Sequence, residues 1–120
     1  MPEWIDVGAL DGIAEPGSRG CAVAGVDGVA FFVVRKAGAV YAYRNRCPHT
    51  GAPLEWLPDE FLDLDKSFIE CAMHGALFRV DDGVCLRGPC AGDSLLALDV
   101  RIEDGRVRVD VSPLGAGQGA

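Results

Sequence analysis

Two short cysteine–histidine motifs constrain this chain more than any other feature. The first is a C-x-H motif at Cys47 and His49, and the second is a C-x₂-H motif at Cys71 and His74. These are the only two histidines in the 120-residue chain, so every imidazole falls inside a motif. Two thiolates and two imidazoles can hold a [2Fe–2S] cluster, with both cysteines on one iron and both histidines on the other. A chain that uses all four must fold so that the two motifs meet.

Other interpretations of the four residues remain open. Tetrahedral zinc also accepts two cysteines and two histidines. Zinc modules usually pair like with like, as C-x₂-C and then H-x₃-H, whereas each motif here supplies one residue of each kind. The spacing favours an iron–sulfur cluster, although ligand type alone does not exclude zinc. The third interpretation is that the cysteines are small buried apolar residues and that no metal binds.

Glycine and proline accompany the two motifs. Gly51 closes the first as C-P-H-T-G, Gly75 closes the second as C-A-M-H-G, and Gly88-Pro89 follows farther on. This arrangement resembles the Rieske iron–sulfur proteins, whose cluster loops read C-x-H-x-G and C-x₂-H-G and whose third loop contains proline. The specific resemblance spans residues 38–90. It implies an all-β fold, a Rieske-like antiparallel β-sandwich with a small inserted cluster-binding lobe.

The resemblance also implies a role for each ligand in one [2Fe–2S] cluster. Cys47 and Cys71 would bind the inner iron, and His49 and His74 would bind the outer, more exposed iron. No residue of the chain is expected to be catalytic.

Two departures from the high-potential members of the family point to its low-potential, ferredoxin-like branch. Those members place a serine after the second-loop glycine and a tyrosine two residues beyond it, where this chain has Ala76 and Phe78. Neither side chain can donate a hydrogen bond to sulfur. Those members also join the cluster loops by a disulfide, and the matching positions here are Ala52 and Met73, which cannot form one.

Charge and hydropathy exclude several classes of protein. The formal net charge is −7, which argues against nucleic-acid binding. An acidic surface suits solubility and attraction to a basic partner, although many soluble domains are equally acidic. No stretch approaches the roughly 20 apolar residues of a membrane span. The start, Met1 to Trp4, lacks the features of an export signal, so we expect a soluble cytoplasmic protein without a membrane anchor.

Alternation of apolar and polar residues predicts a meander of short antiparallel strands. Residues 96–103 and 106–111 alternate on either side of Asp104-Gly105, a hairpin signal because glycine takes the positive φ of a tight turn. Asp27-Gly28 is predicted to make a similar turn between strands at 21–26 and 29–35.

Further turns complete the predicted meander. Residues 36–38 turn the chain into a strand at 39–43 that delivers the first motif. Asp82-Gly83 makes another turn after a strand at 77–80, and Trp4–Val7 is predicted to be an edge strand.

The predicted organisation is one domain followed by a tail. Residues 1–111 form the domain, and 49% hydrophobic residues supply a modest core. Residues 46–91 contain all four ligands and would form the inserted lobe. From Ser112 the chain is glycine-rich, so 112–120 is predicted to be a flexible tail.

Three of the five cysteines lie outside the motifs. Cys21 is in an apolar run and is predicted to belong to the core. Cys85 and Cys90 are close enough in sequence for a local disulfide, which a reducing cytosol disfavours.

The spacer between the two motifs, residues 55–66, is longer than in many ferredoxin-type Rieske proteins. Residues 61–63 and 67–71 are predicted to pair as a hairpin. The spacer is either a docking element with five carboxylates or a solvated loop with Trp56 and Phe61 packed beneath it.

Four arginines lie close to the ligand loops in sequence. They are either a basic docking rim or solvated residues at strand ends, and they are Arg44, Arg46, Arg79 and Arg87.

The motifs predict an electron carrier. Rieske oxygenases add a catalytic domain whose mononuclear iron needs further histidines, and this chain has none to spare. We therefore expect a Rieske-type ferredoxin, not itself an enzyme, that carries single electrons from a flavin-containing reductase to a terminal oxygenase. The alternatives are a small Rieske subunit of a multi-subunit oxidoreductase such as assimilatory nitrite reductase, and a redox-sensing module.

Overall fold

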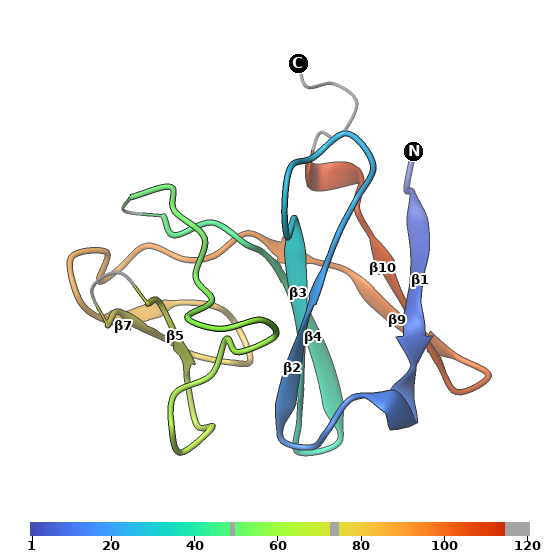
Figure 1. Cartoon of the computed structure of the whole chain (residues 1–120), viewed down its shortest axis with the longest axis horizontal. Coiled ribbons are helices and arrows are strands. Elements are labelled where there is room, and N and C mark those ends of the chain that lie inside the picture. Colours follow the sequence, from blue (N-terminus) through green and yellow to red (C-terminus); the bar gives the residue numbers. More distant parts are fainter. Residues whose placement is uncertain (49, 73–74, 115–120) are drawn as a thin grey trace.

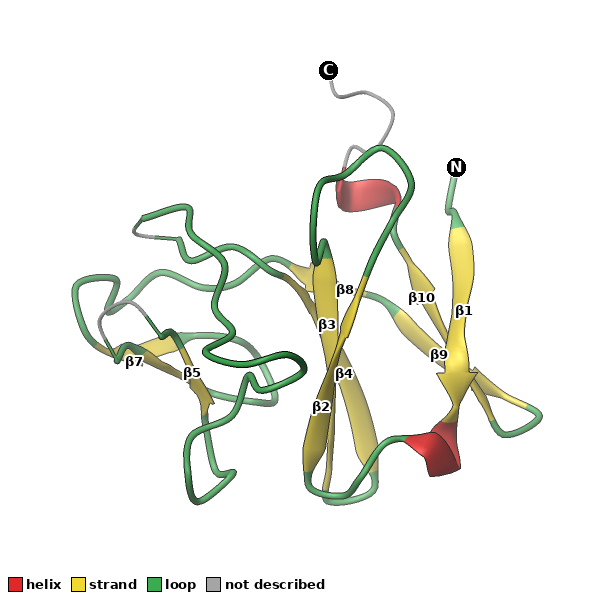
Figure 2. Ribbon diagram, viewed as in Figure 1, coloured by secondary structure: helices red, strands yellow, loops and turns green. Residues whose placement is uncertain are grey.

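The computed structural model describes residues 1–48, 50–72 and 75–114 of the chain. These residues form ten strands and two short 3₁₀ helices, and the strand pairings are antiparallel, which confirms the all-β prediction (Figure 2). The elements are β1 (Trp4–Ala9), η1 (Leu10–Gly12), β2 (Gly17–Cys21), β3 (Phe31–Lys36), β4 (Ala39–Arg44), β5 (Ile69–Glu70), β6 (Leu77–Phe78), β7 (Cys85–Arg87), β8 (Ala97–Leu98), β9 (Val100–Glu103), β10 (Arg106–Asp110) and η2 (Ser112–Leu114). Neither of the described helices has the length and apolar character needed to span a membrane.

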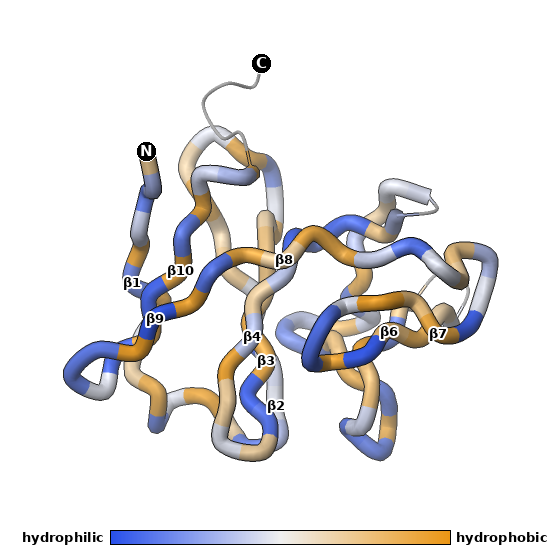
Figure 3. The backbone as a smooth tube through the Cα atoms, turned by 180° about the vertical axis from the view of Figure 1, so that it is seen from behind, coloured by the Kyte–Doolittle hydropathy of each residue, from blue (hydrophilic) through white to orange (hydrophobic). Residues whose placement is uncertain are grey.

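Two of the sheets enclose one of the two cores, the sandwich core. One has the strand order β2-β3-β4-β8 and the other β1-β10-β9, and they face each other as the layers of a sandwich (Figure 1). Phe31 and Val33 of β3 meet Val107 and Val109 of β10 in this core. Along β10 these buried valines alternate with exposed arginines, as a strand with one face in water requires (Figure 3).

Strand β3 is buried on both faces. Phe31 and Val33 belong to the sandwich core, whereas Phe32 and Val34 belong to a second core on the other side of the sheet. All four side chains are 0% exposed. A strand covered on both sides has a continuous apolar run, here F-F-V-V, in place of alternation. Strand β3 is therefore the wall that both cores share.

The second core lies between the sheet that contains β3 and β4 and the predicted lobe, residues 46–91. A third sheet, with the order β5-β6-β7, forms this lobe on the side of β3 and β4 that faces away from β1, β9 and β10 (Figure 1). Phe61 of the lobe stacks on Phe32 of β3, with 4.3 Å between ring centroids. Burying large apolar and aromatic side chains contributes about 1.5–3 kcal/mol each, so packing holds the lobe against the sheet.

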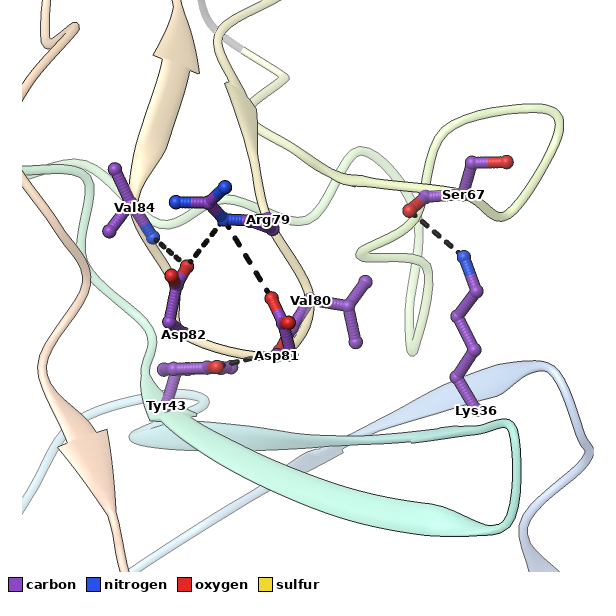
Figure 4. Close-up of polar contacts among 8 residues, drawn as sticks. All are labelled: Lys36, Tyr43, Ser67, Arg79, Val80, Asp81, Asp82 and Val84. Carbon is purple, nitrogen blue, oxygen red and sulfur yellow. Dashed lines mark hydrogen bonds and ion pairs between the residues drawn. The ribbon is translucent and has the colours of Figure 1, made fainter.

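Polar contacts join the lobe to the β3–β4 hairpin (Figure 4). The Tyr43 hydroxyl donates to the Val80 carbonyl at 2.6 Å, and the Lys36 ammonium donates to the Ser67 carbonyl at 3.0 Å. Gly83, in the turn between β6 and β7, lies against the Tyr43 ring: a Cβ there would be 2.7 Å from Cε1. That turn therefore needs glycine for close approach as well as for its φ of +73°.

Most of the predicted turns are confirmed. Strands β9 and β10 pair around Asp104-Gly105, and β3 and β4 pair around Ala37-Gly38. Arg79 and Val84 bond across the turn at Asp82-Gly83. Strand β1 is an edge strand, as predicted. The stretch before Asp104 is divided, because β8 pairs with β4 and β9 pairs with β10.

The prediction at Asp27-Gly28 is wrong. Strand β2 ends at Cys21, which pairs with Phe31 of β3, so residues 22–30 form a loop and not a strand with a tight turn. Val23 and Val26 in this loop pack against the sandwich core. These two valines cover the end of the sandwich core. In the sequence, apolar residues with this role look the same as apolar residues of a strand.

The predicted tail, 112–120, also differs in its first three residues. Ser112–Leu114 form η2, and Leu114 packs against the sandwich core. Residues 115–120 lie outside the described residues. The domain limits of 1–111 stay a prediction.

Candidate metal centre

The two motif loops have the same pattern of backbone hydrogen bonds. In the first, the Cys47 N–H donates to the Ala52 carbonyl at 2.8 Å, and the Gly51 N–H donates to the Cys47 carbonyl at 2.8 Å. In the second, Cys71 bonds in the same way to Ala76 and accepts from Gly75, both at 2.9 Å. Each cysteine thus begins a closed loop of the same length, although the histidine is one position later in the second loop.

Glycine closes both loops for a conformational reason. Gly51 has a φ of +76° and Gly75 a φ of +66°, in the left-handed region that other residues enter at a cost. Each glycine is the fourth residue after its cysteine. The final G of C-x-H-x-G and C-x₂-H-G is therefore a requirement of the loop itself.

The two loops lie side by side. The Ala72 N–H of the second loop donates to the Leu54 carbonyl, just after the first loop, at 2.9 Å. Cys47 is 3% exposed and Cys71 is 1% exposed, and both belong to the lobe core. The structure therefore brings the two predicted cysteine ligands into one buried region at the end of the lobe.

Asn45 holds the first loop in place and was missed by the sequence reasoning. Its Nδ2 donates to the Val29 carbonyl at 3.0 Å and to Glu55 Oε1 at 2.8 Å, and its Oδ1 accepts from the Leu54 N–H at 2.8 Å. The residue is 8% exposed, and such burial of an amide requires these partners. The available signal was the single asparagine of the chain, two residues before Cys47 in R-N-R-C.

The third, proline-containing loop covers the second loop. Gly88 has a φ of +111°, and a Cβ on it would lie 2.9 Å from the Ala76 Cβ and 3.1 Å from the Ala76 Cα. Ala76 and Phe78, the two positions that lack a hydroxyl, are 2% and 0% exposed. This part of the site is therefore packed tightly by small and apolar side chains.

Cys85 and Cys90 lie beneath the third loop and form no disulfide in the described part of the chain. Both are buried, and burial with a neighbouring Cys85 thiol raises the pKa of Cys90 to about 12. Cys21 is partly buried against the sandwich core, where burial raises its pKa to about 11.

The two predicted histidine ligands, His49 and His74, lie outside the described residues, as does Met73. The two described residues of the predicted ligand set suit an iron–sulfur cluster. Both are buried cysteines, they lie in adjacent loops with the same backbone hydrogen bonds, and a histidine follows each of them in the sequence. The assignment of the four ligands stays a prediction.

The basic rim stays a prediction, and two of its four arginines lie beside the first loop. Arg44 and Arg46 line a cavity of about 480 Å³ together with Cys47 and Thr50 of the first loop. Arg79 lies at the far end of β6, where it donates to Asp82 at 3.0 Å and is exposed (Figure 4).

Comparison with known proteins gives one family. A sequence model described as the Rieske [2Fe-2S] domain matches residues 3–107. No curated protein sequence matches the chain.

Three solved structures have a similar fold. A chain of the complex of reduced oxygenase and oxidized ferredoxin in carbazole 1,9a-dioxygenase is 29% identical, with a TM-score of 0.73 over 89% of this chain and 92% of that chain. The ferredoxin of carbazole 1,9a-dioxygenase from Nocardioides aromaticivorans IC177 is 28% identical, with a TM-score of 0.71 over 89% and 96%. The Sphingomonas yanoikuyae B1 ferredoxin is 24% identical, with a TM-score of 0.71 over 90% and 98%, a likeness of fold alone.

Proposed function

This chain belongs to the Rieske [2Fe-2S] domain family, and on that basis we propose that it is a Rieske-type ferredoxin. It binds one [2Fe–2S] cluster, as its family does, and carries single electrons to a terminal oxygenase. Its electron donor is a flavin-containing reductase, it has no catalytic activity of its own, and it works in the cytoplasm.

One observation carries the proposal. The similarity to the ferredoxin of carbazole 1,9a-dioxygenase runs through 89% of this chain and 96% of that ferredoxin, at 28% identity. It therefore includes the sandwich and the lobe together. A similar structure is the complex of an oxygenase with a ferredoxin, which supports a terminal oxygenase as the acceptor. This similarity to ferredoxins favours the carrier over a nitrite reductase subunit or a sensor.

The residues of the chain have distinct tasks. When bound, the [2Fe–2S] cluster accepts and gives up one electron. Cys47 and Cys71, both buried, would supply the thiolates that hold it, and His49 and His74 would supply neutral imidazoles. Asn45 and Gly88 fix the loops from opposite sides through the contacts described above.

Metal and sulfide analysis tests the cofactor. Protein isolated under anaerobic conditions should contain two iron and two acid-labile sulfides per chain, and the dithionite-reduced form should give a Rieske-type EPR spectrum. One zinc and no sulfide would instead establish the zinc interpretation. The acceptor is tested by mixing the reduced protein with the oxidised terminal oxygenase of carbazole 1,9a-dioxygenase and following oxidation of the ferredoxin.

Substitution of the cysteines tests the ligand assignment. Cys47→Ala or Cys71→Ala should lose the cluster and loosen residues 46–91, because the metal joins the two loops. Cys21→Ala is the matched control, since it removes a thiol that lies against the sandwich core and leaves the loops intact. A full Rieske spectrum in Cys47→Ala would show that another residue is the ligand.

A further inference from the structure

The spacer between the two ligand loops leaves large apolar side chains in solvent. Leu64 is 90% exposed, Leu57 is 54% exposed and Trp56 is 43% exposed. These are three of the six exposed large hydrophobic residues in the described part of the chain, and they lie within nine consecutive positions. Of the two alternatives for the spacer, the solvated loop required both Trp56 and Phe61 to pack beneath it, but only Phe61 is buried. Such a concentration of exposed apolar surface is typical of an interaction site.

The spacer is held rigidly in this position. The predicted hairpin is confirmed by the bridge between Leu62 and Ile69. At its tip, the Asp63 carboxylate accepts from the Ser67 N–H at 2.9 Å, and the Asp63 carbonyl accepts from the Lys66 N–H at 2.9 Å. Leu64 is therefore presented by a hydrogen-bonded turn, so little conformational entropy is lost when a partner covers it.

Two of the exposed side chains form one wall of a groove beside the second ligand loop. The groove has a volume of about 250 Å³ and is lined by Trp56, Leu64, Glu70, Cys71, Ala72 and Gly75. We call it the Trp56–Leu64 groove. Because Cys71 is a proposed cluster ligand, a side chain seated in this groove lies next to the loop that holds the cluster.

The charge around the groove selects the kind of partner. Residues 55–70 contain six carboxylates and a single cation, Lys66. Glu70 lines the groove itself, and Asp65 is exposed next to Leu64. A partner that covers this surface must therefore present an apolar side chain surrounded by lysines or arginines.

We propose that the Trp56–Leu64 groove is the docking site for the terminal oxygenase, which inserts an apolar side chain ringed by basic residues. The inference rests on the proposed function and adds the surface through which it acts. Leu64 and Trp56 supply the buried contact, and the carboxylates of the spacer steer the basic face of the oxygenase toward the cluster.

Two glutamine variants test the apolar contact. Leu64→Gln keeps the size of the side chain and adds no charge, and Ile102→Gln makes the same change at an exposed site on β9, on the far side of the sandwich (Figure 1). Reduced protein is mixed with the oxidised terminal oxygenase of carbazole 1,9a-dioxygenase in a stopped-flow instrument. We expect the second-order rate constant of Leu64→Gln to fall about tenfold and that of Ile102→Gln to stay within about twofold. Oxidation by ferricyanide should be equal in both, since this small anion needs no groove.

Asp65→Asn tests the electrostatic part, with Asp104→Asn in the β9–β10 turn as the control. The Asp65 variant should react more slowly at low ionic strength and show a weaker dependence on salt, whereas the Asp104 variant should follow the wild type.

Either of two results would overturn the groove as the docking site, and a third would overturn the oxygenase as its occupant. One is an equal rate for Leu64→Gln and Ile102→Gln with the oxygenase. Another is a concentration-dependent dimer in sedimentation that Leu64→Gln abolishes, because the groove would then bind a second copy. The third result is that wild-type protein carries the cluster but does not reduce the oxygenase, which would mean that the proposed acceptor is wrong. Cytochrome c, a basic haem protein, is then the probe, and equal rates for the two glutamine variants would exclude the groove.

Discussion

At the scale of single side chains, Ala76 and Phe78 are expected to lower the reduction potential of the proposed cluster. Ala76 and Phe78 are buried and cannot donate hydrogen bonds to sulfur. Reduction adds a negative charge to the cluster, so fewer donors mean a lower potential. We expect a midpoint on the order of −150 mV, at the bottom of the Rieske range.

Restoring the hydroxyls with Ala76→Ser and Phe78→Tyr should raise that midpoint by roughly 40–90 mV each, the equivalent of about 1–2 kcal/mol per hydrogen bond to a charged group. Voltammetry measures the change, and Ala91→Ser, at an exposed position just after the third loop, is the control. A wild-type value above about +100 mV would place the chain in the high-potential branch.

Gly88 controls how closely the third loop covers the second. In Gly88→Ala the new Cβ would collide with Ala76, so the loop must move away from the cluster. Gly92→Ala carries a similar positive φ, +97° against +111°, but its Cβ meets nothing within 4 Å. We expect altered EPR g-values and faster loss of the cluster in the Gly88 variant alone. Identical spectra in the two variants would mean that the third loop does not tune the cluster.

At the scale of elements, the lobe depends on the β3–β4 hairpin for its position. The turn between β6 and β7 packs on Tyr43 of β4, and Phe61 stacks on Phe32 of β3. These contacts connect the cluster-binding lobe to the most deeply buried strand of the sandwich, so the stability of the lobe and of the sandwich should be linked.

Gly83→Ala tests this connection. Its Cβ would lie 2.7 Å from the Tyr43 ring, whereas the Cβ of Gly38→Ala, with a similar φ of +81°, meets nothing within 4 Å. The free energy of unfolding should fall by about 1–3 kcal/mol more in the Gly83 variant than in the Gly38 variant, because crowding against Tyr43 adds to the backbone strain that both variants share. Urea denaturation followed by tryptophan fluorescence gives the two values, and equal losses would mean that the turn can move away from Tyr43 without cost.

At the scale of the whole molecule, Asp110 connects the two ends of the described chain. Its carboxylate accepts from the Glu3 N–H at 2.8 Å and from the Ser112 N–H at 3.0 Å. These bonds hold the pKa of Asp110 below its usual value. The ionised carboxylate therefore stabilises the fold above the unfolded pKa of about 3.9, and this contribution is lost as pH falls through the lower folded pKa.

Asp110→Asn should consequently have a lower thermal unfolding midpoint than the wild type at neutral pH. The difference between the two midpoints should become smaller below about pH 4. The midpoints are measured between pH 7 and pH 3. Because both proteins carry the cluster, any loss of the cluster in acid affects both midpoints and leaves their difference unchanged. Asp104→Asn, exposed in a turn, is the control. A difference that stays constant with pH would mean that the carboxylate charge plays no part.

The sequence by itself determined the local features of this protein. The cysteine–histidine motifs predicted the ligand loops, and their closing glycines follow from the loop backbone, a property of six consecutive residues. Turns at Ala37-Gly38 and Asp104-Gly105 were predictable because positive φ is a local requirement. The alternation along β10 was predictable because a strand presents successive side chains to opposite faces.

Only the tertiary structure decided which apolar surfaces meet. Hydropathy did not distinguish Val23 and Val26, which cover the core from a loop, from strand residues. It did not reveal that Asn45 anchors the first loop, or that Gly88 lies on Ala76. It also did not decide whether Trp56 packs beneath the spacer or, as the structure has it, is exposed in a groove that Cys71 also lines. These contacts join residues that are distant in the chain. The free energy of each contact depends on how both cores pack around β3, and a short stretch of sequence does not contain that information.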